Sequence, residues 1–278
     1  MNKPRDDYLC GVGKRGQSRL SIFNTANQDH IKGLLTKLDL QSGMCVLDVA
    51  CGTGDITCQM AERYPDTKVI GIDFSEEQIR IAKENAVDKK LTNVVFIVMS
   101  AYDIKKLSER YNFDRIFIRW VLGHLKDPQL VIESCKSLLK PHGVIVCEEG
   151  DIRTHHCESS NQSFQQCYGL FVSNIVNLQK KRGVDPEIGS KLSNMFYAVF
   201  NDQAIIETER HQLILSSIEQ KEAASTSFLD EVGQKFMDED VLTQQQLSML
   251  KSDLGEIVHE SEAKIYYTAD IAVVLKLR

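Results

Sequence analysis

The stretch VLDVACGTGDIT, residues 46–57, decides the fold of this chain. Its apolar beginning predicts a buried β-strand, and Gly52 and Gly54 predict a tight turn into a helix. Turns of this kind often cradle a phosphate, because backbone N–H groups at a helix start point at the ligand. A dinucleotide-binding fingerprint, however, needs a third glycine where this chain has Thr57. The two glycines alone are therefore a weak signal for a dinucleotide.

Strands and helices alternate between residues 44 and 150. Apolar runs predict strands at residues 44–49, 68–73, 94–99, 114–119 and 143–149. Helical patterns separate these strands, and Ser75 with Gln78 has the spacing of a capping box at the start of one helix. Continuous apolar strands that are separated by helices predict a parallel sheet covered on both faces.

The alternation breaks after residue 150. The later helical patterns and strands occupy residues 158–182, 187–200, 204–215, 217–262 and 270–277. The first of these helices carries Phe164, Tyr168 and Phe171 on one face. Core packing would explain this aromatic stripe, and so would the wall of a ligand pocket. We expect the late helices to cap the sheet rather than to form a separate domain.

Charge and composition narrow the range of partners. The chain has 278 residues, 33 basic and 39 acidic side chains, and a net charge of −6. This balance argues against a nucleic-acid partner, because phosphate contacts require clustered Lys and Arg. The first residues lack the apolar segment of a signal peptide, and no run approaches the roughly 20 apolar residues that span a bilayer. Eight cysteines without a CxxC pair indicate a reducing, cytoplasmic location.

Two acidic residues at strand ends give more information than the glycines. Asp48 precedes the glycine turn, and Asp73 ends the second strand. Because the carboxyl ends of adjacent parallel strands meet at one crevice, we expect both side chains to face the same ligand. Asp73 suits the two hydroxyls of a ribose, whereas Asp48 suits an ammonium group rather than a phosphate. S-adenosylmethionine carries both kinds of group, so the sequence predicts it as the cofactor.

Four segments resemble the motifs of class I S-adenosylmethionine-dependent methyltransferases in their order and spacing. They are VLDVACGTGDIT, VIGIDFS, FDRIFIRWVLGHLKDP and LLKPHGVIVCEE, and the N-terminal YLCGVGKRGQSRL resembles the lid of a small-molecule branch. The resemblance implies an α/β fold, with a doubly wound, mostly parallel seven-stranded sheet whose last strand is antiparallel, and a helical cap. The implied divisions are a lid and helix at 1–43, a cofactor-binding core at 44–150, a helical cap at 151–203, and C-terminal strands with a helical insertion at 204–278.

The resemblance also implies a set of site residues. The expected cofactor-binding residues are Tyr8, Arg19, Asp48, Ala50, Gly52, Gly54, Asp73, Phe74, Ser100, Ala101, Tyr102, Arg119 and Trp120. We expect the glycine turn to contact the methionine part of S-adenosylmethionine. The listed residues between 73 and 102 would contact its ribose and adenine, and the end of the fourth strand would lie near its sulfonium. The two residues of the N-terminal arm would close over the cofactor.

Three positions depart from the family pattern. Ala50 and His142 stand where glycine is common, and we expect both changes to matter only locally. Ser100 stands where many members have an Asp that takes the adenine amino group. The contact with adenine is therefore expected to differ from that of most members.

The expected function is methyl transfer from S-adenosylmethionine to a small organic acceptor, at oxygen, nitrogen or carbon. Because the sulfonium already activates the methyl group, the protein mainly has to align a nucleophile about 3 Å from it. His124 and Glu149 are the candidate bases. A capped turn residue is the favoured alternative for His124, and a solvated strand-end acid would explain Glu149 equally. Tyr168 and Phe171 are the candidate acceptor-binding residues, since segment 151–200 leaves the sheet at its ligand-binding edge.

Several alternatives remain open at this point. A non-methylating enzyme and a non-catalytic binding protein could share the same cofactor-binding fold, and product analysis would distinguish them. The tract THHCE at 154–158 contains possible metal ligands, but adjacent ligands point in different directions, so no metal site is expected. The chain lacks NPPY-like and DPPY-like tetrapeptides and an acid after the fourth strand, which argues against base-amino and magnesium-using members. A monomer and a homodimer are both compatible with the sequence.

Overall fold

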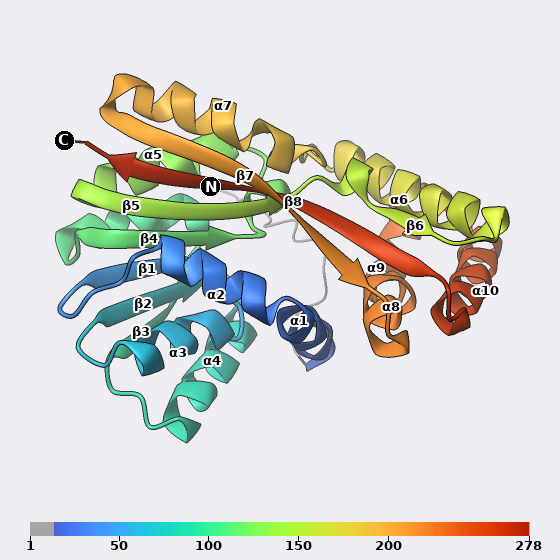
Figure 1. The fold of residues 1–278 in the computed structure, drawn as a ribbon, viewed down its shortest axis with the longest axis horizontal. Coiled ribbons are helices and arrows are strands. Elements are labelled where there is room, and N and C mark those ends of the chain that lie inside the picture. Colours follow the sequence, from blue (N-terminus) through green and yellow to red (C-terminus); the bar gives the residue numbers. More distant parts are fainter. Residues whose placement is uncertain (1–13, 278) are drawn as a thin grey trace.

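A single mixed sheet forms the centre of the molecule. The computed structural model describes residues 14–277, and eight strands of this range join in one sheet (Figure 1). Five of them run parallel in the spatial order β3-β2-β1-β4-β5. Their bounds are β1 Cys45–Val49, β2 Lys68–Asp73, β3 Val94–Val98, β4 Phe113–Arg119 and β5 Leu139–Gly150. The parallel sheet predicted from the apolar runs is confirmed.

Three further strands extend the sheet beyond β5. The last strand, β8 (Lys264–Lys276), runs antiparallel to β5 on one side and to β7 (Ala204–Leu215) on the other. The short strand β6 (His156–Glu158) pairs with the beginning of β8. The doubly wound, mostly parallel sheet with an antiparallel last strand is confirmed, and β6 adds an eighth strand to the seven expected. β8 also begins earlier than residue 270, where the sequence placed it.

Helices cover both faces of the parallel strands. The covering helices are α2 Gln28–Lys37, α3 Asp55–Arg63, α4 Glu76–Asp88, α5 Pro128–Leu138 and α7 Ile188–Phe200. On β1, Val46 packs in one cluster with α2 and α3, whereas the next residue, Leu47, packs with α5 and α7. Ser75 caps the start of α4, because its Oγ accepts a hydrogen bond from Gln78 N at 3.3 Å, whereas Gln78 Oε1 does not return the second bond of a capping box.

A second hydrophobic core lies at one end of the long strands β7 and β8. The helices around it are α6 Gln162–Lys181, α8 Ile218–Ala224, α9 Thr226–Asp238 and α10 Gln244–His259. The helix α1 (Lys14–Ala26) contributes Phe23 to this core, and the two strands contribute Leu215 and Ile265. Figure 1 shows α6, α8, α9 and α10 on the right, away from the five parallel strands. We call this second body the helical lobe.

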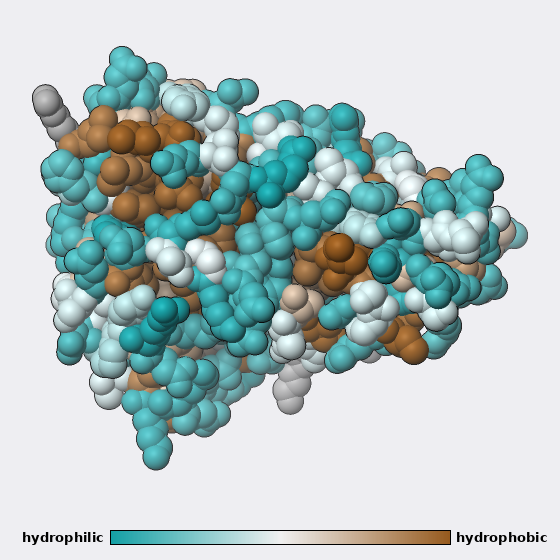
Figure 2. Space-filling view, in the orientation of Figure 1, coloured by the Kyte–Doolittle hydropathy of each residue, from teal (hydrophilic) through white to brown (hydrophobic). Residues whose placement is uncertain are grey.

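Exposed apolar side chains gather over α7 and β7. Figure 2 shows a brown area at the upper left, where Figure 1 draws these two elements, and Tyr197 and Ile205 are each 50% exposed there. Exposed apolar side chains of this kind are common in folded proteins. None of the helices in the described range 14–277 combines the length and the apolar character needed to cross a membrane.

Candidate active site

The carboxyl ends of the parallel strands open into a cavity of about 140 Å³, which we call the turn cavity. The predicted cofactor-binding residues along its wall are Asp48, Ala50, Gly52, Asp73, Phe74, Ser100, Ala101, Arg119 and Trp120. Open α/β sheets bind their ligands in a crevice at this place. Most of the candidates that the sequence provided therefore lie around one cavity.

Three predicted residues lie elsewhere, and a fourth is not among the described residues. Gly54 stands at the start of α3, outside the wall of the turn cavity. The hydroxyl of Tyr102 accepts a hydrogen bond from Asp127 N at 3.1 Å, and the side chain does not line the turn cavity. Arg19 lines a second cavity described below. Tyr8 lies outside the described residues.

The turn after β1 needs an unusual backbone. Ala50, Gly52 and Gly54 have φ angles of 59°, 55° and 77°, all in the left-handed region that favours glycine. A Cβ atom on Gly54 would lie 2.7 Å from the ring of Phe96, so close packing of α3 also requires a glycine there. The glycines therefore shape the turn, and only Gly52 of the pair reaches the cavity wall.

The carboxylate of Asp73 is oriented by two backbone N–H groups. Its Oδ2 accepts a hydrogen bond from Gly52 N at 3.0 Å, and its Oδ1 accepts one from Ser75 N at 2.9 Å. These bonds join the end of β2 to the glycine turn and to the start of α4. The side chain is thereby held at the cavity wall in one orientation.

Asp48 is buried and bonded to the residue that replaces the third glycine. Thr57 Oγ1 donates a hydrogen bond to Asp48 Oδ2 at 2.6 Å. Burial raises the pKa of Asp48 to about 7, the bond from Thr57 opposes this effect, and the nearby charge of Asp73 adds to it. A cationic group in the turn cavity would stabilise the charged carboxylate. The role of Asp48 at an ammonium group, which the sequence predicts, is compatible with this environment and stays a prediction.

Arg119 is fixed at the end of β4 by two partners. Its Nε donates to Glu148 Oε2 at 2.5 Å, and its Nη1 donates to Asn24 Oδ1 of α1 at 2.9 Å. The guanidinium lies 3.7 Å from the ring centroid of Trp120. Trp120 itself has a φ of 54°, which is rare for a bulky residue. Arg119 therefore packs against the indole of Trp120, whose backbone is strained and whose side chain lines two cavities.

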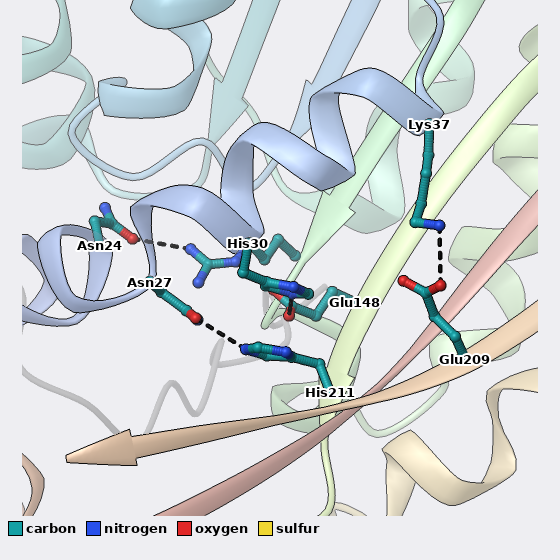
Figure 3. Close-up of polar contacts among 8 residues, drawn as sticks. Asn24, Asn27, His30, Lys37, Glu148, Glu209 and His211 are labelled. Carbon is teal, nitrogen blue, oxygen red and sulfur yellow. Dashed lines mark hydrogen bonds and ion pairs between the residues drawn. The ribbon is translucent and has the colours of Figure 1, made fainter.

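Two stacked histidines continue this network (Figure 3). His30 Nε2 lies 2.6 Å from Glu148 Oε1, and the rings of His30 and His211 stack with their centroids 3.5 Å apart. His211 Nε2 in turn lies 3.0 Å from Asn27 Oδ1. Burial lowers the pKa of His211, and a charge on His30 would lower it further. The network joins α1 and α2 to the ends of β4 and β5 and to β7.

A second cavity of about 170 Å³ lies between the sheet and the helical lobe, and we call it the lobe cavity. Its wall combines polar and apolar side chains and includes four aromatic rings, those of Phe23, Trp120, Phe228 and Tyr267. The two cavities share three wall residues, which are Leu20, Trp120 and His124. They are therefore neighbouring chambers with a common boundary.

Glu149 holds the loop that follows β4. Its Oε1 accepts hydrogen bonds from Val121 N and Leu122 N, both at 2.7 Å, and its Oε2 accepts one from Gly123 N at 3.4 Å. The side chain is buried, and burial raises its pKa to about 7 although the three N–H groups favour the charged form. Glu149 is therefore not a solvated strand-end acid, and its bonds give it a positioning role between Trp120 and His124.

His124 lies at the common boundary of the two cavities, at the end of the short helix η2 (Leu122–His124). Burial lowers the pKa of His124 to about 4, and the positive charges of Arg19 and Lys235 act in the same direction. The imidazole is therefore neutral at neutral pH. Its position fits the candidate base, and its low pKa makes it a weak one.

The two candidate acceptor-binding residues do not reach either cavity. Tyr168 and Phe171 are fully buried in the core of the helical lobe. Ile175 and Gln179, one and two turns further along the same face of α6, line the lobe cavity instead. This corrects the assignment of Tyr168 and Phe171 to the acceptor site. The face of the helix was predicted rightly, but the part of it that meets the cavity was not.

The sequence also missed several polar residues of the two walls. Gln78 lines the turn cavity, and its place on the first turn of α4, just after Asp73, is a signal that could have found it. Gln179 continues the spacing of the aromatic stripe on α6. His155, considered only as a possible metal ligand, lines the lobe cavity. No pattern in the sequence links His155 to this wall.

Comparisons with known proteins agree with this geometry. The family described as "Methyltransferase domain" matches residues 40–199. A demethylmenaquinone methyltransferase of Oceanobacillus iheyensis is 34% identical over 119 residues, 42% of this chain and 49% of that protein. A phosphoethanolamine N-methyltransferase of Triticum aestivum is 29% identical over 256 residues, 89% of this chain and 45% of that protein. The chain thus spans about half the length of these curated relatives.

A solved structure shows the same fold. It is phosphoethanolamine N-methyltransferase 2 of Haemonchus contortus in complex with phosphomonomethylethanolamine and S-adenosylhomocysteine. The likeness covers 94% of this chain and 58% of that one, with a TM-score of 0.57 and 16% sequence identity. The matched family covers more than half of the chain, including the glycine turn and both candidate bases. The chain therefore belongs to the methyltransferase domain family and has the fold of the class I S-adenosylmethionine-dependent methyltransferases.

Proposed function

We propose that the chain transfers a methyl group from S-adenosylmethionine to a small organic acceptor. One observation carries this proposal: the turn cavity and the lobe cavity meet at Leu20, Trp120 and His124. A cofactor in the first chamber and an acceptor in the second would therefore come together at these side chains. The names of the two curated relatives support a small-molecule acceptor.

The donor set of the turn cavity fits this cofactor. Asp73 is oriented by two backbone N–H groups, and its oxygens can accept the ribose hydroxyls as well, because each carboxylate oxygen takes more than one hydrogen bond. Asp48 would face the ammonium group. We place Phe74, Ser100 and Ala101 beside the adenine. Two acids on this wall suit an ammonium and a ribose better than a phosphate.

The residues at the common boundary would position the reaction. S-adenosylmethionine supplies an activated methyl group when it is bound. Arg119 packs against the ring of Trp120, and Glu149 binds the backbone between Trp120 and His124, so these contacts would hold the boundary in place before any ligand binds. The neutral imidazole of His124 would hold a proton that the acceptor loses, where the acceptor carries one. Because its carboxylate accepts three backbone hydrogen bonds, Glu149 acts as a positioning residue in this scheme.

Binding of the cofactor tests the proposal directly. Titration calorimetry with S-adenosylmethionine should give saturable binding to the unchanged chain, and Asp73→Ala should weaken it roughly 10- to 150-fold. This range corresponds to the loss of charge-assisted hydrogen bonds worth about 1.5–3 kcal/mol. The exposed Asp88→Ala serves as the matched control and should bind normally. An undetectable affinity in the unchanged chain, or equal affinities in all three proteins, would refute the assignment.

We also propose that the protein works in the cytoplasm. All seven cysteines in the described residues are free, and most are at least half buried. Burial raises the pKa of Cys58, Cys157 and Cys167 to about 11, which keeps these thiols protonated and unreactive. Free thiols in this state fit a reducing compartment. Fractionation of cells that express a tagged chain would test the location.

A further inference from the structure

The lobe cavity has a chemistry of its own, which no comparison assigns. We infer that it selects an uncharged, single-ring acceptor that carries a hydrogen-bond donor, and that Gln179 and His155 recognise this donor. The inference rests on the proposed function, because it names the class of molecule that would receive the methyl group. Size, wall chemistry, unpartnered polar atoms and charge each support it.

The size and the wall of the lobe cavity favour one aromatic ring. Its volume of about 170 Å³ is close to the roughly 150 Å³ of an apolar cavity that holds benzene. Phe23 meets Trp120 and Tyr267 edge to face, with ring centroids 6.1 Å and 5.3 Å apart. Phe228 and Ile175 add further apolar surface. Such rings present faces and edges on which another ring packs well.

Two buried polar atoms on this wall have no hydrogen-bond partner among the described residues. They are Oε1 of Gln179, whose residue is 2% exposed, and Nε2 of His155. The amide oxygen can only accept a hydrogen bond. Burial lowers the pKa of His155 to about 3, although a hydrogen bond between its ring and the backbone of Thr268 opposes this effect, so the ring is neutral. The ring centroids of His155 and Tyr267 lie 3.9 Å apart. A ligand with an O–H or N–H group would satisfy the amide oxygen, and a hydroxyl could satisfy both atoms.

The charges around the lobe cavity disfavour an anionic acceptor. Among the described residues, one Lys or Arg side chain lines the lobe cavity, and it is Arg19. Its Nε already donates a hydrogen bond to Glu231 Oε1 at 2.9 Å. The same wall contains three carboxylates, those of Glu148, Glu149 and Asp185. A phosphate or carboxylate would therefore lose its hydration without gaining a free cation. The wall fits a neutral molecule.

Three small probes test this selection on the full chain saturated with S-adenosylhomocysteine. They are 4-propylphenol, which has a donor; 4-propylanisole, which has the same body without the donor; and phenyl phosphate, which is anionic. The sequence contains one tryptophan, Trp120, and its emission reports on the lobe cavity. We expect 4-propylphenol to bind about tenfold more tightly than 4-propylanisole, and phenyl phosphate to bind more weakly than both.

The variant Gln179→Leu keeps the volume of the side chain but removes the acceptor. It should lower the preference for the phenol over the anisole from about tenfold to about twofold. Gln166→Leu, an exposed change on the same helix, should leave this preference unaltered, and both variants should keep their melting temperature and their affinity for S-adenosylhomocysteine. His155→Leu should reduce the preference in the same direction.

The outcomes separate this inference from the proposed function. Equal binding of the phenol and the anisole, tighter binding of phenyl phosphate, or no binding of any probe would overturn the inference. An unchanged preference in Gln179→Leu would overturn the assignment of Gln179. If S-adenosylmethionine fails to bind while the unsaturated chain still prefers the phenol, the proposed function fails and the selection by the cavity stands.

Discussion

Gln78 can supply the hydrogen-bond acceptor for adenine that Ser100 does not supply. Its Oε1 is buried at the turn cavity and has no hydrogen-bond partner among the described residues. Ser100, expected beside the adenine amino group, caps the short helix η1 (Ala101–Glu109) and accepts from Tyr102 N at 3.4 Å. The amide oxygen of Gln78 can accept from an adenine amino group, which is the role of the Asp found in many family members.

The first prediction follows from this exchange of roles. Gln78→Leu should weaken S-adenosylmethionine binding about tenfold, because a buried donor on the adenine would lose its acceptor. Ser100→Ala should change the affinity by less than about threefold. Titration calorimetry on both variants measures the difference. A larger effect of Ser100→Ala than of Gln78→Leu would return the adenine contact to Ser100.

The buried carboxyl of Glu149 makes stability depend on pH. Its pKa is raised from 4.5 to about 7 in the folded chain, so the folded state holds this proton more tightly than the unfolded state does. The resulting stabilisation is fully present below pH 4.5 and is lost as the pH rises through 7. Over this window the free energy of unfolding should therefore fall by up to about 3 kcal/mol because of this group.

Glu149→Gln removes the titration and keeps the shape of the side chain. Urea unfolding at pH 5 and pH 7.5 should show the unchanged chain losing stability relative to Glu149→Gln as the pH rises. The exposed Glu133→Gln provides the control and should show no such trend. A difference between the two proteins that is independent of pH would show that burial does not raise this pKa.

At the scale of elements, long periodic patterns were predictable and short or non-periodic ones were not. The bounds of α3 and β7 agree with the sequence patterns. β6 has three residues, too few to show a strand pattern, and the apolar residues of α1 form only a weak stripe. These two elements take their structure from the strands and helices that they pack against.

The network around Glu148 ties several of these elements together. Burial alone would raise the pKa of Glu148, yet Arg119 and His30 hold it below its usual value. Glu148→Gln would leave the buried guanidinium without a counter-charge, and should cost about 3 kcal/mol of unfolding free energy or more. Chemical denaturation measures this loss. Glu77→Gln breaks an exposed ion pair with Arg80 and should cost less than about 1 kcal/mol of unfolding free energy. Equal losses in Glu148→Gln and Glu77→Gln would refute a structural role for the network.

At the scale of the molecule, the turn cavity was predictable and the lobe cavity was not. The turn cavity is built mainly from strand ends and the loops after them, whose order along the sheet follows from the βα pattern. The lobe cavity draws on α1, α6, α9 and the ends of three strands, which lie far apart in the sequence. Their meeting depends on the path of β7 and β8 into the helical lobe (Figure 1). Local patterns carry no information about that path.

The same two strands should make the molecule unfold as one unit. β7 and β8 pair continuously from the parallel sheet to the helical lobe, so neither core can lose its strands alone. Tyr168→Ala removes a fully buried ring from the lobe core and should lower the free energy of unfolding by about 3–5 kcal/mol. Trp120 emission and far-ultraviolet circular dichroism should report one shifted transition with coinciding midpoints.

The half-exposed Tyr197→Ala is the control for this prediction and should cost less than about 1 kcal/mol of unfolding free energy. Two separate transitions would show that the lobe folds independently, and a stable Tyr168→Ala chain with impaired acceptor turnover would return Tyr168 to the acceptor site.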